Sequence, residues 1–144
     1  YGKKLHHIKA HGALYNQMFS DKDLSDFYLD TIKGFQEECY IYIPYNSEIE
    51  KSALEKGFKI MYEAFGDRAY NDNLSLVSRD IKGALINNPK LVIDQISNII
   101  DSEKVKSING KQKSIKADTI CIHSDTDNSI EILKEINKVF KNKK

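Results

Sequence analysis

Four short apolar runs, separated by segments of helical period, constrain the fold of this chain more than any other feature of its sequence. The runs cover residues 5–10, 39–43, 58–63 and 119–123, and each is bounded by residues typical of turns or helix starts. They are too continuously apolar to alternate between a buried and a wet face, which is typical of parallel strands covered by helices on both sides. The sequence therefore predicts an α/β fold built on a parallel sheet of βα units.

Residues that favour helix starts follow each of these runs. At an N-cap, a side-chain oxygen accepts a backbone N–H of the first helical turn. The predicted caps are Ser20, Ser47 in a capping-box pattern with Glu50, Asn88 before Pro89, and Thr126 or Asp127. A strand followed by a helix thus occurs four times, which is about half of an eight-unit (β/α) barrel. A small open sheet is the alternative, because periodicity alone does not separate the two.

Two segments depart from this alternation. Residues 66–87 are polar and irregular, and they are long for a connector, which favours an active-site loop. Residues 105–116 alternate around Asn109-Gly110, a dipeptide typical of tight turns between antiparallel strands. We therefore expect a loop that contributes to a site, and a separate hairpin.

Length and charge narrow the class of protein. A chain of 144 residues suits a single domain over residues 1–144, and a net charge of +1 creates no long-range field that would attract nucleic acid or an anionic membrane. No apolar stretch approaches the length of a membrane span. Cys39 and Cys121 sit inside apolar runs, where reduced, packed thiols are expected, so the sequence indicates a reducing, cytoplasmic compartment.

Ionisable side chains follow three of the four predicted strands. The first strand leads through Lys9 to His11, the third through Glu63 to Asp67 and Arg68, and the fourth ends in His123, Ser124 and Asp125. In parallel α/β folds, the carboxyl ends of the strands meet at one edge of the sheet, where substrates bind. The sequence therefore predicts that these groups converge on one site, with Arg79 supplied by the irregular loop.

Each of these residues also has a purely structural interpretation. A histidine at a strand end can simply bond a neighbouring carbonyl group, and Asp67 with Arg68 can form an ordinary ion pair. Asp125 can be a helix cap, and an exposed Arg79 can be merely solvated. Two histidines at equivalent strand ends, His11 and His123, favour a functional interpretation.

The residue types point to hydrolysis of a small anionic substrate. A carboxylate can orient and charge an imidazole that titrates near neutral pH, as proton transfer requires, and arginine offers a planar fork to a carboxylate or phosphate. The predicted catalytic residues are His11, Asp67, His123 and Asp125, and the predicted substrate-binding residues are Lys9, Glu63, Arg68 and Arg79. No CxxC pair of the kind found in zinc sites is present, and no glycine-rich phosphate loop is present.

Three stretches carry a family likeness. They are HGALYN at residues 11–16, EAFGDRAY at 63–70 and DTICIHSDT at 118–126. In this order and at natural spacing, they resemble the PHGALYN, EvFADRaY and DTICVHGDTP segments of the LamB/YcsF family, which is known as the A component of the ATP-dependent 5-oxoprolinase. The sequence differs from these segments at Ala10, Gly66, Ser124 and Asp127, where we expect mainly altered turn geometry.

The resemblance implies a partial (β/α) barrel related to polysaccharide deacetylases, corresponding to the carboxyl-terminal part of a longer protein. The implied reaction is ATP-dependent hydrolysis of the lactam of 5-oxoproline to L-glutamate, together with partner subunits B and C, with which ATP would be bound. Whether a metal takes part stays open. A self-associating chain is also expected, because half a barrel leaves strand edges uncovered. The alternatives are a deacetylase-like metal-dependent amide hydrolase, and a truncated, non-catalytic chain that binds a small acid or its partners.

Overall fold

The computed structural model describes residues 2–141, and their contacts divide the chain into two compact units, residues 1–63 and 64–144. The expectation of a single domain over residues 1–144 stays a prediction.

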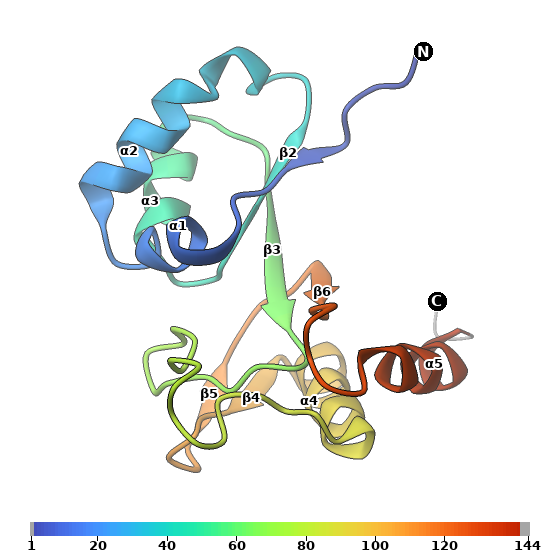
Figure 1. The fold of residues 1–144 in the computed structure, drawn as a ribbon. Helices are drawn as coiled ribbons and strands as arrows, with labels where there is room; N and C mark the ends of the chain where they lie inside the picture. The colour runs from blue at the N-terminus through green and yellow to red at the C-terminus, as the bar shows by residue number, and fades with distance from the viewer. Residues whose placement is uncertain (1, 142–144) are drawn as a thin grey trace. The chain divides into compact units, whose positions relative to one another are not determined.

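The first unit combines three parallel strands with three helices (Figure 1). In chain order, its elements are β1 (His7–Ile8), α1 (Gly12–Gln17), α2 (Lys22–Thr31), a short 3-10 helix (Lys33–Phe35), β2 (Tyr40–Ile43), α3 (Glu48–Glu55) and the start of β3 (Ile60–Phe65). In the parallel register, His7 lies opposite Tyr40, and Ile41 lies opposite Ile60. The strands are the first three predicted apolar runs, with the first run shortened to two residues.

The helices of this unit begin at side-chain caps. Ser47 Oγ accepts the backbone N–H of Glu50 at 3.2 Å, as predicted for α3. The predicted cap of α2, Ser20, is wrong by one residue: Asp21 Oδ1 accepts the N–H of Leu24 at 3.0 Å. Ser20 instead belongs to the turn that ends α1, where its N–H donates to Gln17. Its backbone is therefore already committed to that turn.

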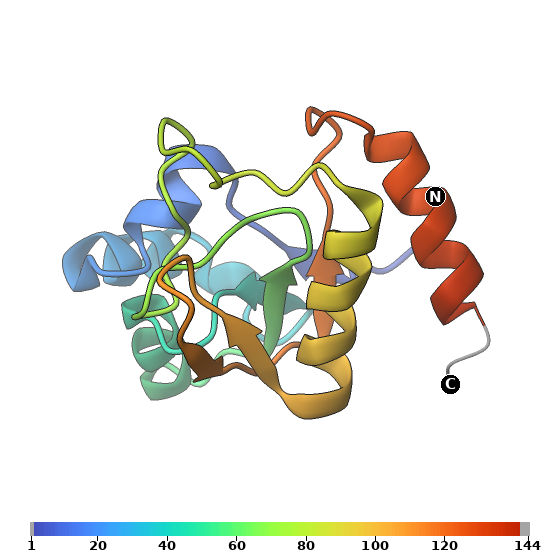
Figure 2. The same cartoon turned by 90° about the horizontal axis from the view of Figure 1, so that it is seen from below.

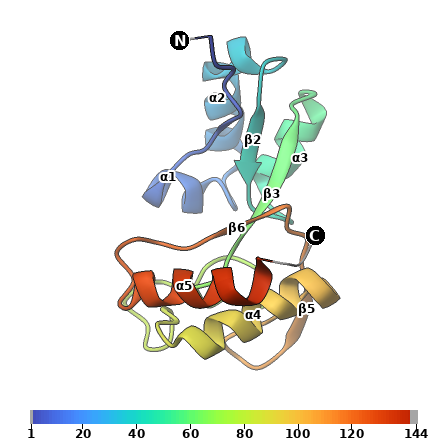
Figure 3. The same ribbon diagram turned by 90° about the vertical axis from the view of Figure 1, so that its right-hand side faces the viewer.

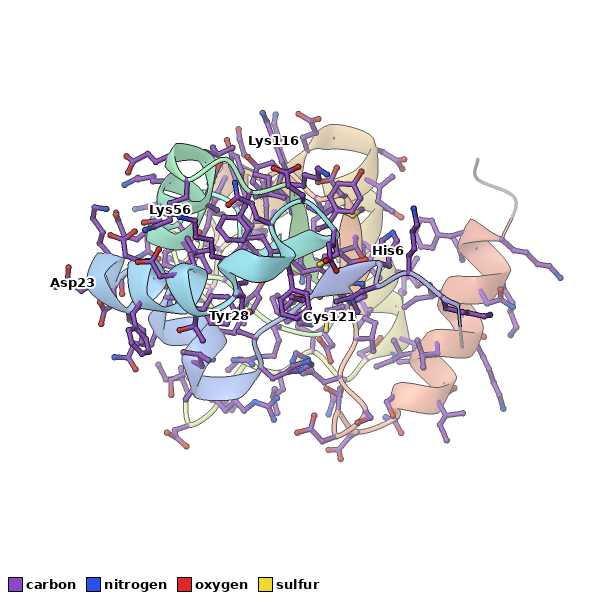
Figure 4. The ribbon with its side chains drawn as sticks, turned by 90° about the horizontal axis from the view of Figure 1, so that it is seen from above. His6, Asp23, Tyr28, Lys56, Lys116 and Cys121 are labelled. Carbon is purple, nitrogen blue, oxygen red and sulfur yellow. The ribbon has the colours of Figure 1, made fainter. Side chains whose placement is uncertain are left out.

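Packing and charge join α2 to α3. Leu29 of α2 and Ala53 of α3 are both completely buried. Lys56 directly follows α3 at the surface and is labelled in Figure 4. Its Nζ donates to the carboxylate of Asp30 in α2 at 2.8 Å. Such a partly exposed pair adds little stability, so the buried side chains hold the two helices together.

The second unit contains the end of β3 and all later elements. These are α4 (Pro89–Ser102), β4 (Lys104–Lys106), β5 (Gln112–Ser114), β6 (Thr119–Cys121) and α5 (Ser129–Phe140). The order of the four-stranded sheet is β1-β2-β3-β6, and Gly66, directly after β3, donates its N–H to the carbonyl of Cys121 in β6 at 3.1 Å. The predicted α/β class with a parallel sheet is confirmed.

A cluster of branched apolar side chains joins α4 to α5, which lie side by side (Figure 3). Val92 and Ile96 of α4 and Ile132 of α5 are almost fully buried. Gly66 adjoins this cluster, because a Cβ atom there would come within 2.7 Å of Ile122 and 2.9 Å of Ile96. The expectation that Gly66 mainly alters turn geometry is therefore wrong. The glycine leaves room for neighbouring isoleucines, and its φ lies outside the left-handed region.

The start of α5 also differs from the prediction. Its N-cap is Asn128, which has a left-handed φ of 63° and makes no side-chain capping bond. The predicted caps, Thr126 and Asp127, lie in the turn before it, and the Thr126 hydroxyl is bonded elsewhere. A tertiary partner has thus replaced the local capping bond.

The hairpin predicted at residues 105–116 is confirmed as antiparallel β4 and β5, which lie beside α4 (Figure 2). One carboxylate, Asp72, fastens it to the irregular segment 66–87. That carboxylate accepts Ser107 Oγ at 2.6 Å, Lys111 Nζ at 2.7 Å and Asn109 Nδ2 at 3.3 Å. The ammonium group of Lys111 and then the Ser107 hydroxyl lower the pKa of Asp72 to about 2.

We expect this carboxylate to make stability depend on pH in the acidic range. Because its pKa is lower in the folded chain than the unfolded value of about 3.9, its contribution is complete above pH ~4 and is lost as the pH falls toward 2. The measurement is thermal unfolding of the wild type and Asp72→Asn at constant ionic strength. The difference in melting temperature should be present at pH 7 and shrink between pH ~4 and ~2. A difference that is constant over this range would contradict the assignment.

Two further sequence expectations concern the thiols and the membrane. Neither Cys39 nor Cys121 forms a disulfide, and Cys39 is buried. Within residues 2–141, no helix combines the length and the apolar character that crossing a membrane would need.

Candidate active site

A buried carboxylate and a half-buried imidazole form the centre of the candidate site. Asp67 lies two residues after β3 and is completely buried, whereas the His123 side chain, two residues after β6, is 24% exposed. His123 Nδ1 lies 3.0 Å from Asp67 Oδ1, and the backbone N–H of His123 donates to Asp67 Oδ2 at 2.8 Å. Phe65 packs its ring almost parallel to the imidazole, with the ring centres 5.3 Å apart. The ring of His123 is therefore held from two sides.

A third residue, Thr126, completes the surroundings of this carboxylate. Its hydroxyl donates to Asp67 Oδ2 at 2.6 Å. Burial by itself raises the pKa of Asp67, but the hydrogen bonds from the His123 side chain, the Thr126 hydroxyl and the His123 backbone outweigh it, so the pKa is lowered. Asp67 is thus ionised at neutral pH although it is fully buried.

The ionised state of Asp67 determines which nitrogen of His123 carries a proton. A carboxylate only accepts hydrogen bonds, so Nδ1 of the neutral imidazole must be the donor. The lone pair is then on Nε2, which has no hydrogen bond among the described residues. An imidazole in this tautomer, next to an oriented carboxylate, can take a proton from water at Nε2.

The loop that carries Asp67 is fixed by side chains outside it. Gln95 of α4 uses its amide nitrogen to donate to the carbonyl oxygens of Phe65 at 2.8 Å and Arg68 at 2.9 Å. The Tyr70 hydroxyl accepts the N–H of Phe65 at 2.7 Å. These bonds leave the loop little freedom, which matters because catalytic groups must be held close to the geometry of the reaction.

Both arginines of the chain belong to this unit. Arg68 is only 4% exposed; its Nη2 donates to the carbonyl of Val77 at 2.7 Å, and its Nε has no partner in the described residues. Arg79 is exposed and pairs with Asp125 at 2.8 Å. Burial first, and then the nearby charge of Arg79, lower the pKa of Arg68, so the two cations lie in each other's field.

The other three predicted site residues lie in the first unit. Lys9 Nζ pairs with Glu63 at 2.6 Å, and both side chains are largely buried. His11 is exposed at the N-cap of α1, where it makes no side-chain capping bond, and the following Gly12 has the positive φ that favours glycine. Lys9 contacts one carboxylate oxygen of Glu63, and the other, Oε2, is buried without a hydrogen-bond partner in the described residues. The predicted meeting of His11 with His123 stays a prediction.

The second unit brings together five of the eight predicted residues: Asp67, Arg68, Arg79, His123 and Asp125. Three of the structural alternatives do not describe what is seen. Asp125 does not cap α5, Asp67 bonds His123 rather than Arg68, and Arg79 is paired. Thr126 is not among the predicted site residues. Its one signal is its place at the end of the DTICIHSDT motif, because its residue type alone favours a helix cap.

Among residues 2–141, no group of three or more His, Cys, Asp or Glu side chains is placed to hold a metal ion. We therefore assign no metal ligands.

The model of the LamB/YcsF family matches residues 1–144. The chain belongs to the LamB/YcsF family. This identification agrees with the motifs at residues 11–16, 63–70 and 118–126, and two of the three surround the Asp67–His123 pair. The family likeness and the geometry of the site thus point to the same residues.

Proteins similar to this LamB/YcsF chain carry informative names. A Campylobacter jejuni protein, named as the A component of 5-oxoprolinase, is 41% identical over 140 residues, which are 97% of this chain and 55% of that protein. A protein of the same name from Pyrococcus horikoshii is 35% identical to this chain, over 96% of this chain and 54% of that protein. The crystal structure of a lactam utilization protein from Thermus thermophilus superimposes with a TM-score of 0.86 at 27% identity, over 97% of this chain and 56% of that one. The chain thus spans about half the length of the curated relatives it matches.

Proposed function

We propose that this chain acts as the A-type component of an ATP-dependent 5-oxoprolinase, which hydrolyses the lactam of 5-oxoproline to L-glutamate. The observation that carries the proposal is the Asp67–His123 pair, in which the buried carboxylate leaves Nε2 available for proton transfer. The names of the relatives and of the similar structure support the choice of substrate.

The proposed chemistry follows from the tautomer of His123. Nε2 takes a proton from a water molecule whose oxygen attacks the lactam carbonyl carbon, and Asp67 stabilises the resulting imidazolium. The C–N bond of the ring then breaks, and the imidazolium returns the proton to the leaving nitrogen. Water has been added across the C–N bond, so the ring is open and its nitrogen is a free amine.

The two arginines suit the carboxylate of the substrate. Arg79 is the accessible cation, with a side chain that is 45% exposed, and the carboxylate of 5-oxoproline would compete with Asp125 for its guanidinium. Arg68 lies behind it with an unpaired buried Nε and adds positive charge. We assign Arg79 to direct contact and Arg68 to support from within the fold.

ATP and the partner subunits enter as parts of the proposal. An unstrained lactam resists water, and phosphorylation of its oxygen by ATP would make the ring carbon electrophilic. After water has added and the C–N bond has broken, that oxygen still carries the phosphoryl group as an acyl phosphate, which a second water molecule hydrolyses to the carboxylate of L-glutamate and inorganic phosphate. No nucleotide-binding loop is evident in the sequence, so we place ATP with partner subunits B and C.

The test supplies the chain with the partner subunits, 5-oxoproline and ATP, and measures L-glutamate. Because the chain spans about half of its relatives, a parallel reaction uses the complete protein, meaning the gene product that contains these 144 residues. Glutamate formation that requires this component supports the proposal. Binding of 5-oxoproline without turnover by the complete protein in the full mixture would instead favour the non-catalytic alternative.

The arginines yield a separate prediction. Arg79→Lys should raise KM for 5-oxoproline about 10-fold with a smaller change in kcat, because lysine lacks the planar fork that grips a carboxylate at two points. Its melting temperature should hardly change, since an exposed ion pair adds little stability. Arg68→Lys, in contrast, should lower the melting temperature, because the substitution disturbs the buried hydrogen bond to the carbonyl of Val77. An unchanged KM in the Arg79 variant would remove this arginine from the substrate site.

A further inference from the structure

Thr126 takes no part in the proton transfers proposed above, yet its hydroxyl makes a short buried contact in the candidate site. Its hydroxyl lies 2.6 Å from Asp67 Oδ2, and the residue is 5% exposed. The same oxygen also accepts the backbone N–H of His123 at 2.8 Å. Two donors therefore hold Oδ2 in place, and Nδ1 of the imidazole lies nearer to Oδ1, at 3.0 Å, than to Oδ2, at 3.2 Å.

We propose that Thr126 is a positioning residue, which orients the Asp67 carboxylate and thereby keeps His123 in the tautomer with its lone pair on Nε2. This inference deepens the proposed function and rests on it for the consequence in catalysis. The orienting effect itself concerns only side chains of the second unit and can be tested without turnover.

The geometry leaves the carboxylate dependent on this hydroxyl. A backbone N–H alone would leave Asp67 free to turn about its last torsion, so that either oxygen could face the imidazole. The threonine hydroxyl can only donate toward an ionised carboxylate, and its β-branched side chain has few rotamers, so the contact is held in one direction. The hydroxyl is also not used to cap α5, which begins without a side-chain cap.

Other charges act on the same pair from neighbouring segments. Arg68 comes from the loop of Asp67, Arg79 from the irregular segment, and Asp125 from the turn before α5. Within the described residues, the side chains of these three bond Val77 or each other, whereas Thr126 touches the carboxylate directly. Removing its hydroxyl should therefore affect Asp67 most.

The first experiment measures the side chains rather than the reaction. NMR of the carboxyl carbon of Asp67 and of the imidazole nitrogens of His123 is recorded against pH for the wild type, Thr126→Val and Thr126→Ser. In the valine variant, the pKa of Asp67 should rise and the fraction of His123 protonated at Nδ1 in the neutral ring should fall, because a donor to the ionised carboxylate is lost. Serine should restore both values. Thr31→Val, at the exposed last residue of α2, is the matched control and should change neither.

The second experiment measures cleavage by the complete protein with its partner subunits. Thr126→Val should lower kcat about 10-fold or more with little change in KM, and Thr126→Ser should stay within about 3-fold of the wild type. If valine fails to fold, Thr126→Ala removes the hydroxyl without placing a methyl group against the carboxylate, and the same results are expected. A valine or alanine variant that only melts earlier, with the Asp67 titration and the His123 tautomer unchanged, would overturn the proposal. If no protein cleaves 5-oxoproline, the proposed function fails, whereas the titrations still decide the role of Thr126.

Discussion

His123→Ala in the complete protein, assayed with its partner subunits, is expected to lower 5-oxoproline cleavage by between about 100-fold and 10,000-fold, the range typical of a positioned acid or base. The loss should fall mainly on kcat, because the imidazole acts on the attacking water and the leaving nitrogen rather than on the bound substrate. The Nε2 lone pair has no partner in the described part of the chain, so removing the ring leaves no other polar group there without its hydrogen bond to Nε2.

The control for this variant is structural. His123 keeps its backbone N–H bond to Asp67 whatever its side chain, so the turn before α5 should persist in the alanine variant. Far-ultraviolet circular dichroism and the melting temperature should show a folded protein. Full cleavage activity in a folded His123→Ala variant would assign the imidazole a structural role.

Asp67→Asn should also reduce kcat by about 100-fold or more, although it changes one buried atom and little volume. Two donors, the Thr126 hydroxyl and the His123 backbone N–H, meet at Oδ2. The amide oxygen must occupy that position, because the backbone N–H cannot become an acceptor. The amide NH2 then takes the place of Oδ1, the oxygen nearer to Nδ1, so we expect Nδ1 to accept from it and the proton of the neutral imidazole to move to Nε2. The base needed at Nε2 is lost.

Two comparisons make this prediction specific. Asp94→Asn on the exposed side of α4 makes the same chemical change away from the site and should leave kcat unchanged. The double variant Asp67→Asn with His123→Ala should lose no more activity than His123→Ala alone, because residues that act as a unit are not additive. Losses that multiply in the double variant would show that Asp67 acts on the reaction independently of His123.

The sequence by itself determined the architecture and the chemical types of the site. Short apolar runs bounded by turn residues are typical of strands, so the strands, the helices between them and the hairpin could be predicted from period and turn residues. Strand ends in a parallel sheet meet at one edge, and this topological rule was enough to place Asp67 and His123 among the candidate site residues. It does not depend on any particular contact.

The tertiary structure decided which side chains pair. Threonine is a residue type that often caps helices, so the sequence favours a cap at Thr126. Only the folded chain shows that its hydroxyl instead donates to Asp67, which is distant in sequence. Arg68 follows Asp67 directly, yet neighbours in sequence near a strand end point in different directions, and Arg68 bonds Val77 while Asp67 bonds His123. Hydrogen bonds between distant segments depend on distances of a few tenths of an ångström, which no periodic pattern encodes. The family and its βα units can therefore be predicted from the sequence, whereas the orientation of the Asp67 carboxylate and the tautomer of His123 depend on the folded chain.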